Sequence, residues 1–323
     1  MSRHLPLWPL ALAALVPAPS GCGGSDESAG SSGGGGPPGP TQIEPFPLPA
    51  AQHEHGDPSG PEQQMLELIQ RARANPAAEG ELLANLPEAQ TAIAQYGVDT
   101  AKLVADFASY EPAPPLAFDP QLAEAARFHS DDMATNGFQG HEGTAGDKLA
   151  DRIKQAGYVY SRVGENVFAR AKSVTHCQAA FLIDWGNEDL GHRLLTLDLE
   201  NRMRHVGLSI IENPSNSNVG PLVVTQDFGM PMDDSLRYLV GVVYADLNGN
   251  GAYDPAEGLP DAYIVPDQGG FYAVTSWSGG YAIPFSPGLG ELRVQLQSAP
   301  GKAVQQKTAT IADENVNLDF LLE

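Results

Sequence analysis

The stretch DPQLAEAARFHSDDM, residues 119–133, decides how the central part of this chain folds. Asp119 followed by Pro120 is a typical helix start, because the aspartate side chain accepts bonds from free backbone N–H groups and proline lacks a donor that the first turn would leave unpaired. Apolar side chains and one histidine then recur at helical spacing, at Leu122, Ala125, Ala126, His129 and Met133. The pattern predicts an amphipathic helix with one face in a core.

The segments on either side extend this prediction. Residues 59–62, SGPE, have capping-box spacing, and the helix that they start is interrupted at Asn75-Pro76. Helical patterns also run from about 147 to 157 and from about 173 to 185. The pattern then changes to β-branched runs at 206–211 and 222–228, joined by a loop typical of a hairpin. We expect an α+β domain over residues 60–232, with helices covering a small sheet.

From Tyr238 onwards the chain predicts a second, all-β domain over residues 238–323. Short runs rich in strand-forming residues alternate with turn residues, and this spacing favours an immunoglobulin-like sandwich. The expected strands are 239–244, 262–265, 271–274, 281–285, 292–296 and 316–321.

The first 59 residues predict export and a tether. Residues 1–22 have a short apolar run and small residues before Cys22, which resembles the signal of a bacterial lipoprotein acylated at that cysteine. Plain secretion is the alternative. Residues 23–59 are rich in Gly, Ser and Pro and predict a flexible tether. We expect a protein exported to the bacterial cell envelope, anchored in the outer membrane or at the cell surface by lipid on Cys22.

Charge and cysteine content limit the partners and the disulfide bonds that the chain can have. The 40 acidic and 18 basic residues give a formal net charge of −22, which repels nucleic acid phosphates and excludes that class of partner. The chain has 2 cysteines. If Cys22 carries lipid, only Cys177 is left, so no internal disulfide can form, and Cys177 lies in an apolar helical pattern that favours a buried position.

The ordered motifs of the central region resemble the CAP superfamily of SCP-like extracellular domains. The resemblance implies an α-β-α sandwich with a central cleft that holds two histidines and two glutamates. The motifs that carry it are LAEAARFHSDDM (122–133), GH (140–141), GENV (164–167), Trp185, GHR (191–193), VGL (206–208) and TQDFG (225–229).

Carried onto this sequence, the resemblance assigns the two histidines to His141 and His192 and the first glutamate to Glu165. In plant members the second glutamate follows a tryptophan by three residues, a position that here is Glu188, although the local sequence departs from the bacterial pattern. Two imidazoles and two carboxylates that converge would suit zinc with open positions. The alternative is a polar cluster that braces the helices against the sheet.

The sequence leaves the activity open. A glutamate beside a metal-bound water would suit a metal-dependent hydrolase, with Glu165 and Glu188 as the catalytic candidates, but the chain has no nucleophile elbow and no His-Glu-x-x-His run. CAP domains resemble binding modules as much as enzymes. We therefore expect binding of a lipid, peptide or cell-surface ligand first and hydrolysis second, while the oligomeric state is not predicted.

The β-domain contains a specific calcium-loop pattern at residues 246–257, DLNGNGAYDPAE. Glycine stands at position six, and the loop follows the EF-hand spacing although its flanks are β-rich. The expected calcium ligands are Asp246, Asn248, Asn250, Asp254, Glu257 and the carbonyl of Ala252. The surrounding sequence resembles the B-type repeats of bacterial adhesins and carboxypeptidase-regulatory-like domains, in which calcium would brace the fold. A turn that holds no ion is the alternative.

Overall fold

The computed structural model describes residues 43–200, 202–213 and 218–322. The predicted signal peptide, Cys22 and residues 23–42 of the predicted tether lie outside these residues. None of the helices in the described part is long and apolar enough to cross a membrane.

The predicted helix starts are confirmed. Helix α1 (Gly60–Ala74) begins after Ser59, whose hydroxyl accepts from the Glu62 backbone while the Glu62 carboxylate accepts from the Ser59 backbone, a complete capping box. Helix α5 (Pro120–Asn136) begins after Asp119, whose carboxylate accepts two backbone N–H bonds. It ends at Gly137, which adopts the left-handed conformation that glycine tolerates.

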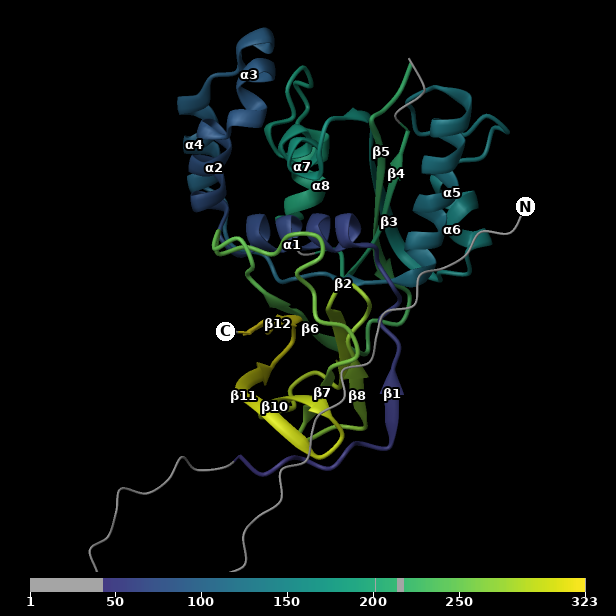
Figure 1. Ribbon diagram of the computed structural model, residues 1–323. Coiled ribbons are helices and arrows are strands. Elements are labelled where there is room, and N and C mark those ends of the chain that lie inside the picture. Colours follow the sequence, from purple (N-terminus) through teal and green to yellow (C-terminus); the bar gives the residue numbers. More distant parts are fainter. Residues whose placement is uncertain (1–42, 201, 214–217, 323) are drawn as a thin grey trace, which may run out of the picture. The chain divides into compact units, whose positions relative to one another are not determined.

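The α+β region (residues 60–232) is built on a sheet of strand order β2-β4-β5-β3 (Figure 1). The predicted hairpin is β4 (His205–Glu212) with β5 (Leu222–Pro231), and it is antiparallel. The edge strand β3 (Tyr160–Ala171) pairs antiparallel with β5, and the short β2 (Ala117–Phe118) pairs parallel with β4.

Helices cover both faces of this sheet, as Figure 1 shows. Helices α5 and α6 (Leu149–Gln155) lie on one face, while α1, α7 (Val174–Ile183) and α8 (Gly191–Leu197) lie on the other. Cys177 is buried in the core between α1, α7 and the sheet, and burial raises the pKa of its thiol. Apolar side chains of α1 and α7 also contact the group formed by α2 (Pro76–Asn85), η1 (Pro87–Ala89), α3 (Gln90–Tyr96) and α4 (Thr100–Ala108).

One close approach explains a glycine of the 206–208 motif. A Cβ placed on Gly207 of β4 would lie 2.1 Å from the backbone of Leu122 and Ala123 in α5. Only a residue without a side chain allows the strand and the helix to pack this closely. The motif residues at 122–133 and 206–208 thus belong to one helix–sheet contact.

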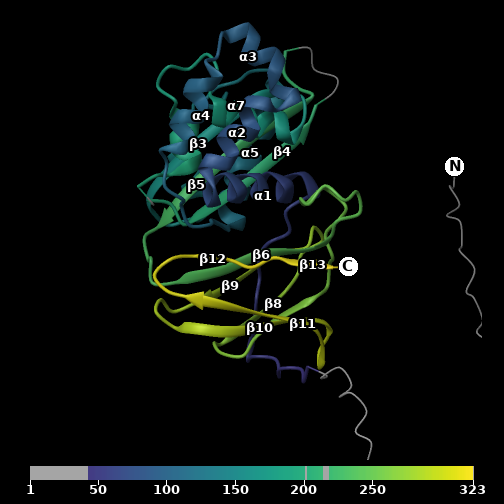
Figure 2. The same ribbon diagram turned by 90° about the vertical axis from the view of Figure 1, so that its left-hand side faces the viewer.

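The β region consists of two further sheets that share one apolar core. One has the order β1-β8-β7-β10-β11, and in the other β6 (Arg237–Ala245) pairs with β9 (Gly280–Phe285), β12 (Val316–Asn317) and β13 (Phe320–Leu322) (Figure 2). The first sheet contains β1 (Ala51–His53), β7 (Tyr263–Pro266), β8 (Phe271–Val274), β10 (Gly290–Ala299) and β11 (Lys302–Ile311). An immunoglobulin-like topology stays a prediction.

The N-terminal segment corrects the predicted extent of the tether. Residues 51–53 form strand β1, which pairs in parallel with β8, and the backbone of Phe46 bonds to the side chains of Gln295 and Gln297. The strand is only three residues long and forms its sheet contacts through the backbone, so composition alone did not reveal it. The segment that precedes α1 in the sequence is therefore part of the β region.

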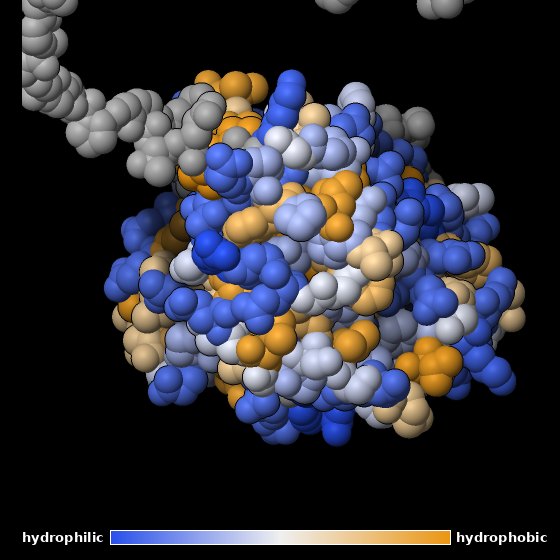
Figure 3. All heavy atoms as spheres, turned by 90° about the horizontal axis from the view of Figure 1, so that it is seen from below, coloured by the Kyte–Doolittle hydropathy of each residue, from blue (hydrophilic) through white to orange (hydrophobic). Residues whose placement is uncertain are grey.

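Figure 3 views the end of the molecule formed by the β region, and it shows separate apolar patches among hydrophilic side chains.

Hydrogen bonds join the α+β region to the β region. The Nδ2 atom of Asn315 donates to the carbonyl oxygens of Pro115 and Arg204, both over 3.1 Å. Gln64 on α1 also donates to Asp254 Oδ1 in the predicted calcium loop, over 2.9 Å.

Candidate functional site

The first histidine–acid pair joins His141 to Glu165 on β3. The Nδ1 atom of His141 donates to Glu165 Oε1 over 2.8 Å, while Arg152 of α6 donates to Glu165 Oε2 over 2.5 Å. The Glu165 side chain is 2% exposed and the His141 side chain is 60% exposed. The hydrogen bond to Glu165 raises the pKa of His141. This pair therefore has a buried, neutralised acid and an imidazole that reaches the surface.

Arg152 organises the surroundings of this pair. Its guanidinium is buried and also bonds to the Asp147 carboxylate and to the backbone carbonyl of His141. Asp227 lies opposite Glu165 on the neighbouring strand and is fully buried. Burial, followed by the nearby Glu165 charge, raises the pKa of Asp227 well above its usual range and favours its protonated form. Arg152 is thus the buried cation that pairs with the Glu165 carboxylate.

The loop that carries His141 is held from helix α5. His129 is fully buried, and its Nε2 donates to the carbonyl oxygen of Gly140 over 2.7 Å. Burial lowers the pKa of His129, so the neutral ring acts as a fixed hydrogen-bond donor. Beside this loop lies a hollow of about 350 Å³, lined by His141, Glu142, Lys148, Leu149 and Glu165.

The second pair joins His192, at the start of α8, to Asp184. The Nδ1 atom of His192 donates to Asp184 Oδ1 over 2.7 Å, and the backbone N–H of His192 donates to Asp184 Oδ2 over 2.9 Å. Asp184 ends α7 in a left-handed conformation, with φ of 57°, which aspartate tolerates better than most residues. The ring of Phe181 lies 5.4 Å from the His192 ring, between centroids.

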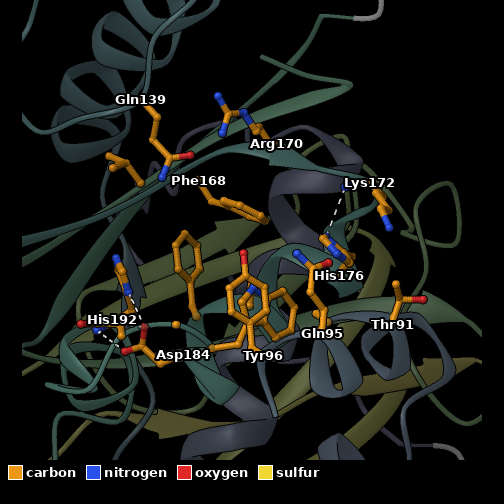
Figure 4. Close-up of a pocket in the computed structure, with 17 residues that line it drawn as sticks. Thr91, Gln95, Tyr96, Gln139, Phe168, Arg170, Lys172, His176, Asp184 and His192 are labelled. Atoms are coloured by element: carbon orange, nitrogen blue, oxygen red, sulfur yellow. Dashed lines mark hydrogen bonds and ion pairs between the residues drawn. The ribbon is translucent and has the colours of Figure 1, made fainter. Parts of the chain in front are cut away.

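This second pair opens into the larger hollow, of about 520 Å³ (Figure 4). Figure 4 shows His192 and Asp184 together at one end, with Lys172 and His176 together at the other. Burial lowers the pKa of His176. Four aromatic side chains line the hollow, and so do two cations from the end of β3 and the turn after it: Tyr96, Phe168, Phe181, Trp185, Arg170 and Lys172.

The predicted site residues on β3 and α8 bond to different neighbours. Consecutive residues of a strand point to opposite faces, and on β3 Glu165 points towards α6 while Asn166 points towards α8. His141 and Glu165 line one hollow, and His192 lines another. In the structure His141 bonds to Glu165 and His192 bonds to Asp184, and a single cleft for all four predicted residues stays a prediction.

The partner of His192 is Asp184, and Glu188 is exposed in the turn that follows. The aromatic-x-x-acid spacing that pointed to Trp185 and Glu188 also occurs at Phe181 and Asp184. The earlier pair ends a helix, which fixes the carboxylate against the start of α8. This spacing, read one helical turn earlier, would have identified the acid.

The donors of these two pairs do not suit zinc. A dication at Glu165 would compete with Arg152, whose buried guanidinium already lies on the same carboxylate. Across the described ranges, no three His, Cys, Asp or Glu side chains gather as a metal site requires. We therefore derive no metal-dependent hydrolysis by Glu165 or Glu188.

The acidic side chains of the predicted calcium loop accept hydrogen bonds from backbone groups of the same loop. Asp246 accepts from the backbone N–H groups of Gly249, Asn250 and Gly251, which wraps the loop around this carboxylate. Glu257 is buried and accepts from the N–H groups at 247 and 254, which ties the end of the loop to its start.

The remaining predicted ligands complete this loop. The amides of Asn248 and Asn250 both donate to Asp254 Oδ2 over 2.7 Å, and Asn250 Oδ1 accepts from the Ala252 backbone over 2.8 Å. Within the described part of the chain, Asp246, Asp254 and Glu257 have no Lys or Arg ion-pair partner. Within the described residues these three carboxylates do not gather as a metal site requires, and calcium binding by the loop stays a prediction.

A family model agrees with this architecture: the model of the cysteine-rich secretory protein family, CAP, matches residues 66–228. The chain belongs to the CAP family. The match spans the sheet and both histidine–acid pairs of the CAP domain. A search among curated proteins found no match.

Two solved structures show some similarity to this CAP protein. One is an extracellular protein containing a SCP domain from Bacillus anthracis str. Ames, 23% identical, covering 43% of this chain and 40% of that chain, with a TM-score of 0.29. The other is an outer surface protein from Borrelia burgdorferi, 13% identical, covering 45% of this chain and 94% of that chain, with a TM-score of 0.30. The chain thus spans less than half of the Bacillus anthracis protein.

Proposed function

We propose that this chain is an exported surface CAP protein that binds an anionic, amphipathic ligand in the hollow beside His192. The observation that carries the proposal is a contrast in charge. The whole chain has a formal net charge of −22, yet Arg170 and Lys172 line this hollow together with a single carboxylate. That carboxylate belongs to Asp184 and is engaged by His192. The hollow therefore attracts a negative group that the rest of the surface repels.

The aromatic side chains supply the apolar half of the proposed site. Phe168 and Phe181 contact each other edge to face, and Trp185 lies beside His176 with centroids 5.6 Å apart. Such side chains bury a ligand's apolar part, while a few polar groups set its orientation. An aliphatic or aromatic anion matches this combination better than a free inorganic anion or a neutral sugar.

The test is calorimetric titration of the full chain with decanoate below its micelle concentration. Decyl maltoside and decyltrimethylammonium serve as neutral and cationic comparators. We expect saturable binding of decanoate only, weakened about tenfold by the double variant Arg170→Ala/Lys172→Ala, since each exposed ion pair contributes up to about 1 kcal/mol. Arg162→Ala, an exposed arginine on the same strand outside the hollow, is the control and should bind like wild type. Equal binding of all three amphiphiles would contradict the proposal.

For the β region, we propose that the 246–257 loop binds calcium and that the ion braces this region against α1. The proposal is supported by the oxygen donor set, by its carboxylates without cation partners and by the bond from Gln64 to Asp254. Calcium is abundant outside cells, so even a weak site would be filled there. We expect calcium to raise the melting temperature relative to EGTA, and Glu257→Gln to remove most of that increase. Glu291→Gln, an exposed glutamate on β10, is the control.

Attachment to the membrane through lipid on Cys22 is part of the same proposal. Residues 43–53 run along the β region, so a tether that precedes them would hold the protein by that region. Mass spectrometry of the mature N-terminus tests the lipid, and an unacylated terminus would remove the anchor.

A further inference from the structure

A further hollow, distinct from those of both histidine–acid pairs, lies between helix α1 and the β region. It has a volume of about 170 Å³, and its wall includes Glu67 of α1, Asp319 and Tyr253. An adjoining hollow of about 180 Å³ shares Glu67 and Asp319 with it. The wall of the first space also includes Leu68, Val242, Tyr244, and Gly251 and Ala252 of the 246–257 loop, and Arg71 lines both spaces.

The two carboxylates in this wall have hydrogen-bond donors but no cation of their own. Glu67 accepts from Gln63 Nε2 over 2.7 Å, and Asp319 accepts from the Val242 backbone over 3.0 Å. The nearby guanidinium of Arg71 is bound by both carboxylate oxygens of Glu79, at 2.7 and 2.8 Å.

Lys307 is the other cation close to this wall. Its ammonium bonds to the backbone oxygen of Asp319, over 2.7 Å, rather than to the carboxylate. Burial, followed by the Asp319 charge, raises the pKa of Glu67 to about 8, and burial also raises the pKa of Asp319. Two acids facing one space in this way favour either a retained proton or a bound cation.

Tyr253 provides an independent indication of a ligand. The residue is 6% exposed, and within the described residues its hydroxyl has no hydrogen-bond partner. Its ring is held edge to face against Tyr244, with centroids 5.9 Å apart. A buried hydroxyl without a partner costs about 1–3 kcal/mol, so a group that bonds to it would recover that free energy.

We propose that this cavity binds a primary ammonium group, with Glu67, Asp319 and the Tyr253 hydroxyl accepting its three N–H donors. A divalent metal ion is less well matched, because two carboxylates and a phenol are a poor set for an ion that prefers several charged oxygens. The apolar wall of Leu68, Val242 and Tyr244, and the adjoining hollow, leave room for an alkyl chain on the nitrogen. The ligand class is therefore a small primary alkylamine or the end of a lysine side chain.

The experiment uses the full chain with the calcium loop saturated. Calorimetric titration with n-butylammonium chloride is compared with tetramethylammonium chloride, which has no N–H donor, and with magnesium chloride. We expect saturable binding of butylammonium alone. Tyr253→Phe should weaken it about fivefold, for one lost hydrogen bond, and Glu67→Gln or Asp319→Asn should weaken it at least about tenfold. Glu124→Gln, an exposed glutamate on α5, is the matched control and should leave binding unchanged.

Tyr253→Phe keeps this test decisive, because it removes only a hydroxyl that lacks a partner and should leave the unliganded protein at least as stable. Binding of tetramethylammonium or magnesium with the same dependence on Glu67 would overturn the proposal. So would butylammonium binding that ignores all three substitutions. The cavity is separate from the hollow beside His192, so decanoate binding and butylammonium binding can fail independently.

Discussion

The two histidine–acid pairs of the CAP domain flank the same edge strand and have similar hydrogen-bond lengths, but their acids are held differently. The Glu165 carboxylate forms an ion pair with the buried Arg152, and Glu165 lies opposite the buried Asp227 on the neighbouring strand. Asp184 accepts two backbone N–H bonds and bonds from the His192 ring and the Asn187 amide, with no Arg or Lys bonded to its carboxylate among the described residues, and it lies beside a hollow lined by cations and aromatic rings. The difference teaches that a histidine–carboxylate bond alone does not identify a functional site. The groups behind the acid decide whether the pair braces the fold or is available to a ligand.

The largest expected effect comes from removing the cation behind Glu165. Arg152→Met should cost about 3–5 kcal/mol of unfolding free energy, because Glu165 would be left buried without its partner. Urea denaturation followed by circular dichroism measures the loss. The control is Arg162→Met. Arg162 lies at an exposed position on β3, the strand that carries Glu165, so this change should affect stability little. A loss below about 1 kcal/mol for Arg152→Met would break the distinction between the pairs.

A smaller effect is expected at the second pair. Asp184→Asn should cost about 1 kcal/mol, since the amide oxygen still accepts backbone bonds and asparagine tolerates the left-handed conformation. Glu188→Gln is the matched control and should be neutral, because Glu188 is exposed in the turn. The same denaturation experiment compares them, and a larger loss for Glu188→Gln than for Asp184→Asn would restore Glu188 as the partner of His192.

The smallest effect concerns pH. The bond to Glu165 raises the pKa of His141, so the protonated ring is favoured in the folded state. Its stabilisation is complete below the ordinary histidine pKa of about 6.5 and is lost as pH rises through the raised value. Because the His141 side chain is largely exposed, the contribution should stay below about 1 kcal/mol. An NMR titration that places the His141 pKa at or below 6.5 would contradict this.

Much of the fold could be predicted because local signals and long-range packing agree. The caps at Ser59 and Asp119, the break at Asn75-Pro76 and the hairpin of β4 and β5 all follow from residues close in sequence. Strand β11 was missed because it is an edge strand whose sequence is largely polar, and β3 was missed because its polar motif residues hide the strand pattern.

The candidate site was predicted less well, for a physical reason. Motif spacing identified His141, Glu165 and His192 but could not show that His192 bonds to Asp184 and not to Glu188. Arg152, which decides the character of Glu165, carries no motif and comes from a different element. Spacing along the chain does not encode the face of a strand on which a side chain lies. It also does not encode which charged group pairs with that side chain.

The most direct test of the account is to observe which histidine responds to a ligand. Two-dimensional NMR of the imidazole C–H groups, recorded while decanoate is added to the full chain, reports each ring separately. The account predicts that the His192 and His176 signals move with a common saturation curve while His141 stays fixed. Movement of His141 with His192 unchanged would contradict it and would place the binding site at the Glu165 pair.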